Sequence, residues 1–141
     1  MDEIDRNILS ALELNARIST SDLARKLGIA RTTVQSRIDR MEQSGVIRGY
    51  TIKLGQAQQP KLRATVLISF EPHSAPSLLS RIKAIPEVRS AVTTSGRFDM
   101  RIELVAQSTD ELDNILDTIY AAKGVKGSQS LIHLSRKIDR D

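Results

Sequence analysis

The spacing of apolar residues between positions 31 and 44 predicts an amphipathic helix. Val34, Ile38 and Met41 recur at helical intervals, so their side chains share one face. The polar residues that turn away from this face are Thr32, Gln35, Ser36, Asp39 and Arg40, with Arg31, Thr33 and Arg37 on its flanks. Hydroxyls, an amide and guanidiniums on one surface suit a DNA groove, because arginine and glutamine read base edges by paired hydrogen bonds.

A shorter helix is predicted immediately before it. Ser19 is expected to cap this helix, since its hydroxyl can accept a hydrogen bond from the amide of Asp22. Gly28 permits the left-handed conformation that ends a helix. The apolar stripe consists of Leu23, Ala24 and Leu27. Two such helices joined by a short turn form a helix-turn-helix unit, although an ordinary helical hairpin with a solvated polar face is the alternative.

The distribution of charge favours a DNA-binding role for this pair of helices. Residues 1–16 carry one basic and four acidic side chains, whereas residues 17–48 carry seven basic and three acidic ones. The chain as a whole has a net charge of +4, and residues 49–141 contain no comparable basic block. A local excess of cations is what contacts with DNA phosphates require. The expected DNA-binding residues are Ser21, Arg25, Lys26, Arg31, Thr32, Thr33, Gln35, Ser36, Arg37 and Arg40.

A further helix is predicted over residues 2–15. Its inward stripe is Ile4, Ile8, Ala11 and Leu12, and its N-terminal acids are Asp2, Glu3 and Asp5. Gly45 is expected to end the helix that begins near Arg31. The β-branched residues 46–52 are expected to be extended, as a short wing or a linker strand. Residues 55–60 show no apolar periodicity and are interpreted as a linker.

From Leu62 onward the pattern changes to alternating strands and helices. Strands are predicted over 62–70, 88–94, 100–105 and 125–134. Pro72 and Pro76 are expected to bracket a loop, before a helix marked by Leu78, Leu79 and Ile82. A capping box formed by Ser108 and Glu111 opens a second helix, with Leu112, Ile115, Leu116 and Ile119 inward and with Gly124 closing it. The order β-α-β-β-α-β is that of the ferredoxin-like fold.

This arrangement places both helices on one face of a four-stranded antiparallel sheet. Several positions on the opposite face are apolar, as at Leu67, and an uncovered apolar surface calls for a partner. We therefore predict a homodimer in which two sheets pack face to face. Such a dimer would supply the two-fold symmetry with which helix-turn-helix proteins read palindromes.

Composition excludes several other classes of protein. Hydrophobic residues make up 40% of the chain and charged residues 27%, as in a soluble globular protein. No apolar run approaches the ~20 residues that span a bilayer, and no signal peptide is visible, so a cytoplasmic location without a membrane partner is expected. There is no cysteine, so neither a disulfide framework nor a thiolate metal site nor a cysteine nucleophile is expected. The few aromatic residues, without tryptophan, favour duplex DNA over single-stranded nucleic acid, whose bases stack on aromatic side chains.

An enzyme is not expected. The two histidines, His73 and His133, are accompanied by no recognisable nucleophile and no metal-ligand spacing. The sequence also lacks a glycine-rich phosphate-binding loop. We therefore predict no catalytic residue, no metal ligand and no cofactor.

At the level of whole motifs the chain resembles the Lrp/AsnC family of transcription factors. The matching segments are DEIDRNIL, DLARKLGI, SRIDRMEQSGVIRGY and, in the second half, SGRFD. The resemblance covers essentially the whole chain. It implies an N-terminal DNA-binding domain, a C-terminal domain that senses an amino acid, dimers formed through the sheets, and larger assemblies of dimers that are commonly octameric.

The resemblance also implies an effector site. Gly96 and Asp99 match the Gly-x-x-Asp turn that in this family lies beside the amino acid, between neighbouring dimers. The expected effector-binding residues are Gly96, Arg97, Phe98, Asp99, Ser128 and Ser130. Exposed turn amides would bind the carboxylate of an amino acid and Asp99 its ammonium group. Taken without the resemblance, Gly96 and Asp99 more commonly serve a hairpin turn alone.

Two residues depart from the family pattern. Ala30 stands where family members usually place a serine that caps the recognition helix, and the loss of such a cap typically costs ~1 kcal/mol. Thr32 is an alternative source of a cap. Arg97 lies inside the effector turn, where a guanidinium would either attract an acidic effector or point to solvent.

Together these observations predict an α+β protein with four segments. A (winged) helix-turn-helix domain is expected over residues 1–54, a linker over 55–61, a ferredoxin-like ligand-sensing and oligomerisation domain over 62–135, and a fraying tail over 136–141. The expected function is a sequence-specific regulator of transcription that binds duplex DNA under the control of an amino acid. The alternative is an oligomeric amino-acid-binding protein without operator specificity.

Overall fold

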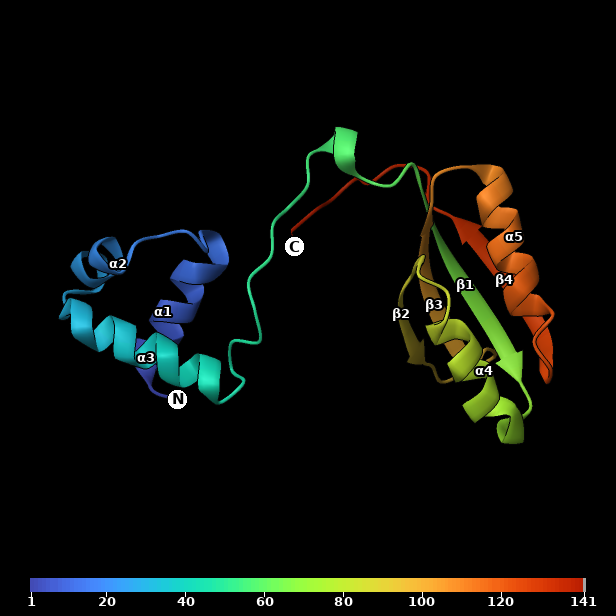
Figure 1. The fold of residues 1–141 in the computed structure, drawn as a ribbon, viewed down its shortest axis with the longest axis horizontal. Helices are drawn as coiled ribbons and strands as arrows, with labels where there is room; N and C mark the ends of the chain where they lie inside the picture. The colour runs from blue at the N-terminus through green and yellow to red at the C-terminus, as the bar shows by residue number, and fades with distance from the viewer. Residues whose placement is uncertain (141) are drawn as a thin grey trace. The chain divides into compact units, whose positions relative to one another are not determined.

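A computed structural model describes residues 1–140 of the 141-residue chain, so Asp141 of the expected tail lies outside the described residues. The chain divides into two compact units, the first spanning Met1–Lys53 and the second beginning at Leu54 (Figure 1). The expected linker therefore groups with the second unit. It contains a short 3-10 helix, η1 (Gln56–Gln58), and the side-chain amide of Gln59 donates to the carbonyl of Leu54 at 3.0 Å.

The first unit consists of three helices around one small core. They are α1 (Glu3–Leu14), α2 (Thr20–Leu27) and α3 (Arg31–Gln43), which confirms the predicted helix-turn-helix arrangement. The apolar stripes meet in a cluster of buried residues: Ile8, Ala11, Leu23, Ala24, Val34, Ile38 and Met41. Asp5 of α1 is buried beside them and is only 2% exposed, which the hydrophobic pattern did not indicate.

No strand forms at residues 46–52, so the predicted wing or linker strand is wrong. Gly45 adopts a positive φ of 79° after α3, as predicted for a helix end, and the amide of Ile47 then donates back to the carbonyl of Met41 at 3.0 Å. Ile47 packs against the helical core. A strand requires a neighbouring strand for its backbone hydrogen bonds, and the described part of the chain places none beside this segment.

The second unit is a four-stranded antiparallel sheet with two helices, as predicted. Its elements in chain order are β1 (Leu62–Phe70), η2 (Pro72–Ser74), α4 (Ala75–Lys83), β2 (Val88–Thr93), β3 (Met100–Ala106), α5 (Thr109–Tyr120) and β4 (Val125–Ile132). The strand order is β2-β3-β1-β4, so β1 and β3 occupy the centre. Both helices cover the same face of this sheet (Figure 1). This is the ferredoxin-like arrangement.

The register explains which face is buried. Alternate residues of β1, namely Ala64, Val66, Ile68 and Phe70, are buried against the helices. In β3 the residues paired with the first three of them are Leu104, Ile102 and Met100, which are also buried. Because side chains alternate across a strand, Thr65 and Leu67 project to the opposite face.

Three local features of the second unit differ from expectation. Pro76 lies in the first turn of α4 instead of in a loop, which is allowed because that turn has no use for the proline amide. At the start of α5, Ser108 Oγ accepts from the amide of Glu111 at 3.1 Å, but the Glu111 carboxylate accepts from the amide of Gln107 instead of completing the box. The C-cap of α5 is Ala121, so Gly124 does not end this helix. Gly124 lies between α5 and β4 and has a positive φ of 92°.

The uncovered face of the sheet is less apolar than expected. Leu67, Val92 and Leu131 lie on it, and Val92 and Leu131 are exposed. Polar contacts occupy its centre, where Thr65 Oγ1 donates to Glu103 at 2.9 Å and lies 2.7 Å from His133 Nε2. Arg101 Nε lies 3.5 Å from Glu103 Oε1. The face is therefore mixed, with apolar side chains around a hydrogen-bonded polar group.

Candidate nucleic-acid interface and effector site

The turn between α2 and α3 is built by local capping. Ser19 Oγ accepts from the amide of Asp22 at 3.0 Å, and Gly28 adopts a left-handed φ of 68°, both as predicted. Ala30 is the N-cap residue of α3, and no side chain caps this helix. Thr32 therefore does not replace the missing serine. Arg31 at the start of α3 donates from Nε to Thr20 Oγ1 at 3.3 Å, which connects the two helices.

The outer surface of α3 has the orientation that its periodicity predicts. Val34, Ile38 and Met41 are buried. The exposed side chains, which together we call the α3 face, are Arg31, Thr32, Gln35, Ser36, Asp39 and Arg40, while Thr33 and Arg37 are half-buried at its flanks. Gln35 Nε2 donates to Asp39 Oδ1 at 2.7 Å, so this amide is already oriented on the surface.

Arg37 and Arg40 are both held by acids of α1. Arg37 donates to the carboxylates of Asp2 and Asp5, the latter at 3.2 Å, and its side chain is 22% exposed. Arg40 Nη2 lies 3.3 Å from Asp5 Oδ2, but its side chain is 63% exposed and remains at the surface. Of the two arginines, Arg40 is therefore the one still presented to a ligand.

This acid–base cluster shifts the ionisation of its members. Hydrogen bonding from Arg37, with help from the amide of Asp5, lowers the pKa of Asp2 to about 2. Burial alone would raise the pKa of Asp5, but hydrogen bonds from Arg37 and from the amide of Asp2 outweigh it, so the pKa of Asp5 is lowered. The same contacts raise the pKa of Arg37. All of these groups are thus charged at neutral pH.

The expected DNA-binding residues of α2 are all exposed. Ser21, Arg25 and Lys26 lie on the side of the helix away from Leu23 and Ala24. Arg25 Nη1 lies 3.3 Å from Asp22 Oδ1, and both side chains are more than half exposed. Such a surface ion pair is weak and exchanges readily for another anion.

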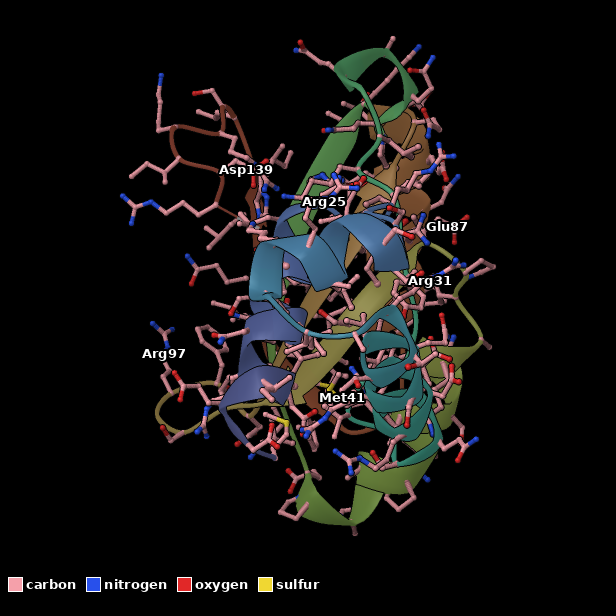
Figure 2. The ribbon with its side chains drawn as sticks, turned by 90° about the vertical axis from the view of Figure 1, so that its left-hand side faces the viewer. Arg25, Arg31, Met41, Glu87, Arg97 and Asp139 are labelled. Atoms are coloured by element: carbon pink, nitrogen blue, oxygen red, sulfur yellow. The ribbon has the colours of Figure 1, made fainter. Side chains whose placement is uncertain are left out.

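The predicted effector turn, residues 95–99, joins β2 to β3. Gly96 has a φ of 99°, and the turn is closed by Thr94, whose amide donates to the carbonyl of Asp99 at 3.0 Å. Arg97 lies at the exposed loop (Figure 2) with its guanidinium carbon 5.3 Å from the centre of the Phe98 ring. Phe98 is half-buried. Arg97 is therefore positioned over an aromatic ring and at the surface at the same time.

Asp99 has a structural partner within the sheet. Its Oδ2 atom accepts from the amide of Phe70 at 3.0 Å, and its own amide donates to the carbonyl of Ile68 at 2.8 Å. The carboxylate is thus fixed at the end of β1, with further lone pairs that can accept from a ligand.

Ser128 and Ser130 do not adjoin this turn within the chain. They pair with Ile68 and Val66 on the β4 side of β1, whereas β3 lies on its other side. Two strand spacings, about 10 Å, therefore separate them from the start of β3. Both serines are exposed. The two cavities described in this unit are lined by other residues: one lies between residues 84–87 and α5, and one between residues 56–63 and 133–139.

The histidine contacts are not those of a catalytic triad. Thr65 and Glu103 both approach the same ring nitrogen of His133, Nε2, at 2.7 Å and 3.7 Å. In a triad the nucleophile and the carboxylate contact opposite nitrogens of the imidazole. In addition, the Thr65 hydroxyl donates to Glu103. Within residues 1–140, no three of His, Cys, Asp and Glu gather as metal ligands would.

Comparison with known proteins identifies both units. Residues 1–48 match a family model described as winged helix-turn-helix DNA-binding, and residues 63–141 match the Lrp/AsnC ligand binding domain. The regulatory protein AsnC of Escherichia coli strain K12 is 30% identical over 145 residues, covering 99% of this chain and 94% of that protein. The HTH-type transcriptional regulator FL11 of Pyrococcus furiosus is 27% identical over 135 residues, covering 95% and 89%.

Solved structures give the same result for the whole chain. The structure of E. coli AsnC superimposes with a TM-score of 0.90 at 28% identity, covering 100% of this chain and 97% of that one. A transcriptional regulator of Neisseria meningitidis in complex with L-methionine superimposes with a TM-score of 0.89 at 22% identity, covering 99% and 93%. Among the described residues, every helix is too short or too polar to cross a membrane.

Proposed function

The chain belongs to the Lrp/AsnC family of DNA-binding transcriptional regulators, and we propose that it reads duplex DNA through the α3 face under the control of an amino acid. The family pairs a helix-turn-helix unit with a ligand-binding domain and consists of regulators, not of enzymes.

The observation that carries the DNA-reading role is the composition of the α3 face. One buried apolar stripe holds the helix, and the opposite side presents guanidinium, hydroxyl and amide groups to solvent. These groups read base edges or bind phosphates. Because Arg37 is bound by Asp2 and Asp5, we assign base reading to Arg31, Gln35 and Arg40 and assign Arg37 a positioning role.

The experiment compares two exposed arginines of the same unit. Arg31→Ala removes a cation from the α3 face, while Arg6→Ala removes one from the outer side of α1. If Arg31 contacts a guanine, the first change should weaken operator binding by ~1–3 kcal/mol and relax specificity at one base pair. Arg6→Ala should have little effect. Equal losses for the two variants would remove Arg31 from the reading set.

The effector assignment is supported by Asp99, whose carboxylate lies beside a tight turn and can accept further hydrogen bonds. An amino acid needs donors for its carboxylate and an acceptor for its ammonium group. Backbone amides of the effector turn can provide the first, and Asp99 can accept from an ammonium while it also accepts from Phe70. The relative from N. meningitidis was solved with L-methionine, which makes an amino acid the first class of ligand to test.

Two substitutions at Asp99 separate the structural role from the binding role. Asp99→Asn keeps an oxygen that can accept from the Phe70 amide but removes the negative charge, whereas Asp99→Ala removes both. If the carboxylate binds an ammonium group, Asp99→Asn should abolish the effector response and leave the melting temperature nearly unchanged. A normal dose response in the Asn variant would show that Asp99 serves the sheet alone.

We also infer a homodimer through the uncovered face of the sheet. Leu67, Val92 and Leu131 provide apolar area there, and the polar group of Thr65, Glu103 and His133 is already hydrogen-bonded internally. A polar group satisfied in this way can be covered at a lower cost than an unpaired one. Sedimentation of Leu131→Lys tests the proposal, because a dimer through this face should dissociate, and an unchanged mass would contradict it.

A further inference from the structure

A groove in the second unit gathers cations that are far apart in the sequence. The amide of His133 donates to the carbonyl of Arg63 at 2.9 Å, which extends the pairing of β1 and β4 by one residue. The segments that precede β1 and follow β4 therefore leave the same end of the sheet side by side (Figure 1). Between them lies an open groove of about 1120 Å³, lined by residues 56, 57, 59–61, 63 and 133–139.

The groove has a strong excess of positive charge. Among its described lining residues are four cations, namely Lys61, Arg63, Arg136 and Lys137, and a single acid, Asp139. Arg136 Nη1 lies 3.4 Å from Asp139 Oδ1, so the acid is already engaged. No carboxylate within residues 1–140 pairs with Lys61, Arg63 or Lys137. Three cations of the groove are therefore available to bind an anion.

We propose that this basic groove binds backbone phosphates of the duplex that the helical unit reads. The proposal rests on the proposed function, because it requires that the chain binds duplex DNA. Compact cations on flexible stems suit phosphate oxygens, which are read without regard to sequence. No aromatic side chain lines the groove, so stacking of single-stranded bases is not favoured.

The groove and the helical unit are joined by a single segment of one chain. Ile47 is the last residue that packs on the helical core, and Gln56 is the first residue of the groove lining. Residues 48–55 between them lie in no helix or strand, and nine residue steps span at most about 32 Å. A phosphate-binding surface on such a tether acts at a raised effective concentration once the helical unit has bound. Weak individual contacts can therefore add measurable affinity.

An amino-acid effector fits the groove poorly. Four lining cations against one acid would attract the carboxylate of an amino acid but repel its ammonium group. The shared chemistry of the groove is that of a phosphate, which is supplied either by the DNA backbone or by a free phosphate ion. The experiment therefore needs one arm for each source.

The first arm measures how the affinity of the full chain for a mixed-sequence duplex depends on salt. The groove variant is Lys61→Gln/Arg63→Gln/Lys137→Gln. The matched control removes the same charges elsewhere in the second unit, as Arg81→Gln/Lys83→Gln/Lys123→Gln, at exposed positions. Each lost phosphate contact lowers the slope of log K against log salt by about 0.9. We expect the groove variant to lose about two to three units of slope and the control less than one.

The outcomes separate the groove from the proposed function. Equal slopes in the two variants, with wild-type binding intact, would overturn the groove and leave the α3 face in place. No duplex binding by the wild-type chain would overturn both. Arg31→Ala should weaken operator binding more than mixed-sequence binding, whereas the groove variant should weaken both equally. If the groove variant lost operator binding alone, that result would contradict a phosphate-binding role of the groove.

The second arm titrates inorganic phosphate against chloride at equal ionic strength. Amide signals of the groove residues are followed by NMR. We expect phosphate to displace DNA no better than chloride does and to cause no saturable shift at Lys61 or Lys137. Saturable shifts of these amides, together with an unchanged salt slope in the groove variant, would reassign the groove to a free phosphate ligand.

Discussion

The carboxylate of Asp5, near the start of α1, lies 3.2 Å from the guanidinium of Arg37 in the middle of α3. Asp5 is buried, and Arg40 approaches its second oxygen at 3.3 Å. Charged pairs at such a site fix the geometry of the two elements that carry them, because either charge alone would be costly. The contact therefore sets how α3 is held on α1, and it withdraws Arg37 from the DNA-reading residues.

Arg37→Met should accordingly destabilise the helical unit more than Arg40→Met does. The first change leaves the buried Asp5 with Arg40 as its remaining ion-pair partner, and it removes the hydrogen bond between Asp2 and α3. The second change removes a side chain that is already 63% exposed. Urea unfolding followed by helical circular dichroism measures the difference. Equal midpoints for the two variants would contradict the positioning role of Arg37.

The same cluster predicts an acid-labile helical unit. The pKa of Asp2 falls from 3.8 to about 2 on folding. Because the folded carboxyl group binds its proton more weakly, its stabilising contribution is complete above the unfolded pKa and is lost as the pH falls through the folded one. We therefore expect the melting temperature to drop between about pH 4 and about pH 2.

Thermal melts of two variants over that pH range test this expectation. Asp2→Asn should reduce the pH dependence, because it removes one of the two carboxyl groups of the cluster whose pKa is lowered. Glu13→Gln, at an exposed acid of the same helix, should leave it unchanged. A wild-type dependence that survives in Asp2→Asn would assign the acid lability to other carboxyl groups.

Ala30→Ser should stabilise the protein. The residue before α3 has the extended conformation of a capping position but contributes no side-chain hydrogen bond. A serine there can accept from an orphan amide of the first turn, which is worth ~1 kcal/mol. Ser19→Ala is the converse control, since it removes the bond to Asp22 and should cost a similar amount. Denaturant midpoints measure both, and a destabilising Ala30→Ser would exclude a simple missing cap.

Gly124→Ala should destabilise the second unit severely. The residue has a φ of 92°, and a Cβ atom placed on it would lie 2.4 Å from the Cβ of Ser74, which is buried. Gly96 has a similar φ of 99°, but a Cβ atom there would meet nothing within 4 Å. Gly96→Ala should therefore cost only backbone strain, ~1–2 kcal/mol. Calorimetric melts compare the two, and equal losses would show that the contact with Ser74 is easily relieved.

Local patterns were sufficient to predict most of the fold. The face of α3 follows from helical periodicity alone, and the bond from the amide of Asp22 to Ser19 follows from its spacing. The alternation in β1 likewise indicated its buried side. The segment 46–52 was predicted incorrectly because β-branched residues favour a strand only where a neighbouring strand exists.

Tertiary contacts between distant residues were not predictable in this way. Asp5 had the appearance of a surface acid, and only the packing of α1 on α3 brings it to Arg37. The bond from Phe70 to Asp99 depends on the register of β1 with β3. Lys61 and Lys137 form no basic block in the sequence, and the pairing of β1 with β4 is what brings their segments together.

The most direct test of the central claim is fluorescence anisotropy of the full chain on duplex DNA from upstream of its own gene, with each free amino acid added in turn. A regulator of the kind proposed should bind with a strong salt dependence, and at least one amino acid should shift the midpoint. An affinity for this duplex that no amino acid changes would contradict the amino-acid effector. Amino-acid binding without any affinity for duplex DNA would contradict the account as a whole.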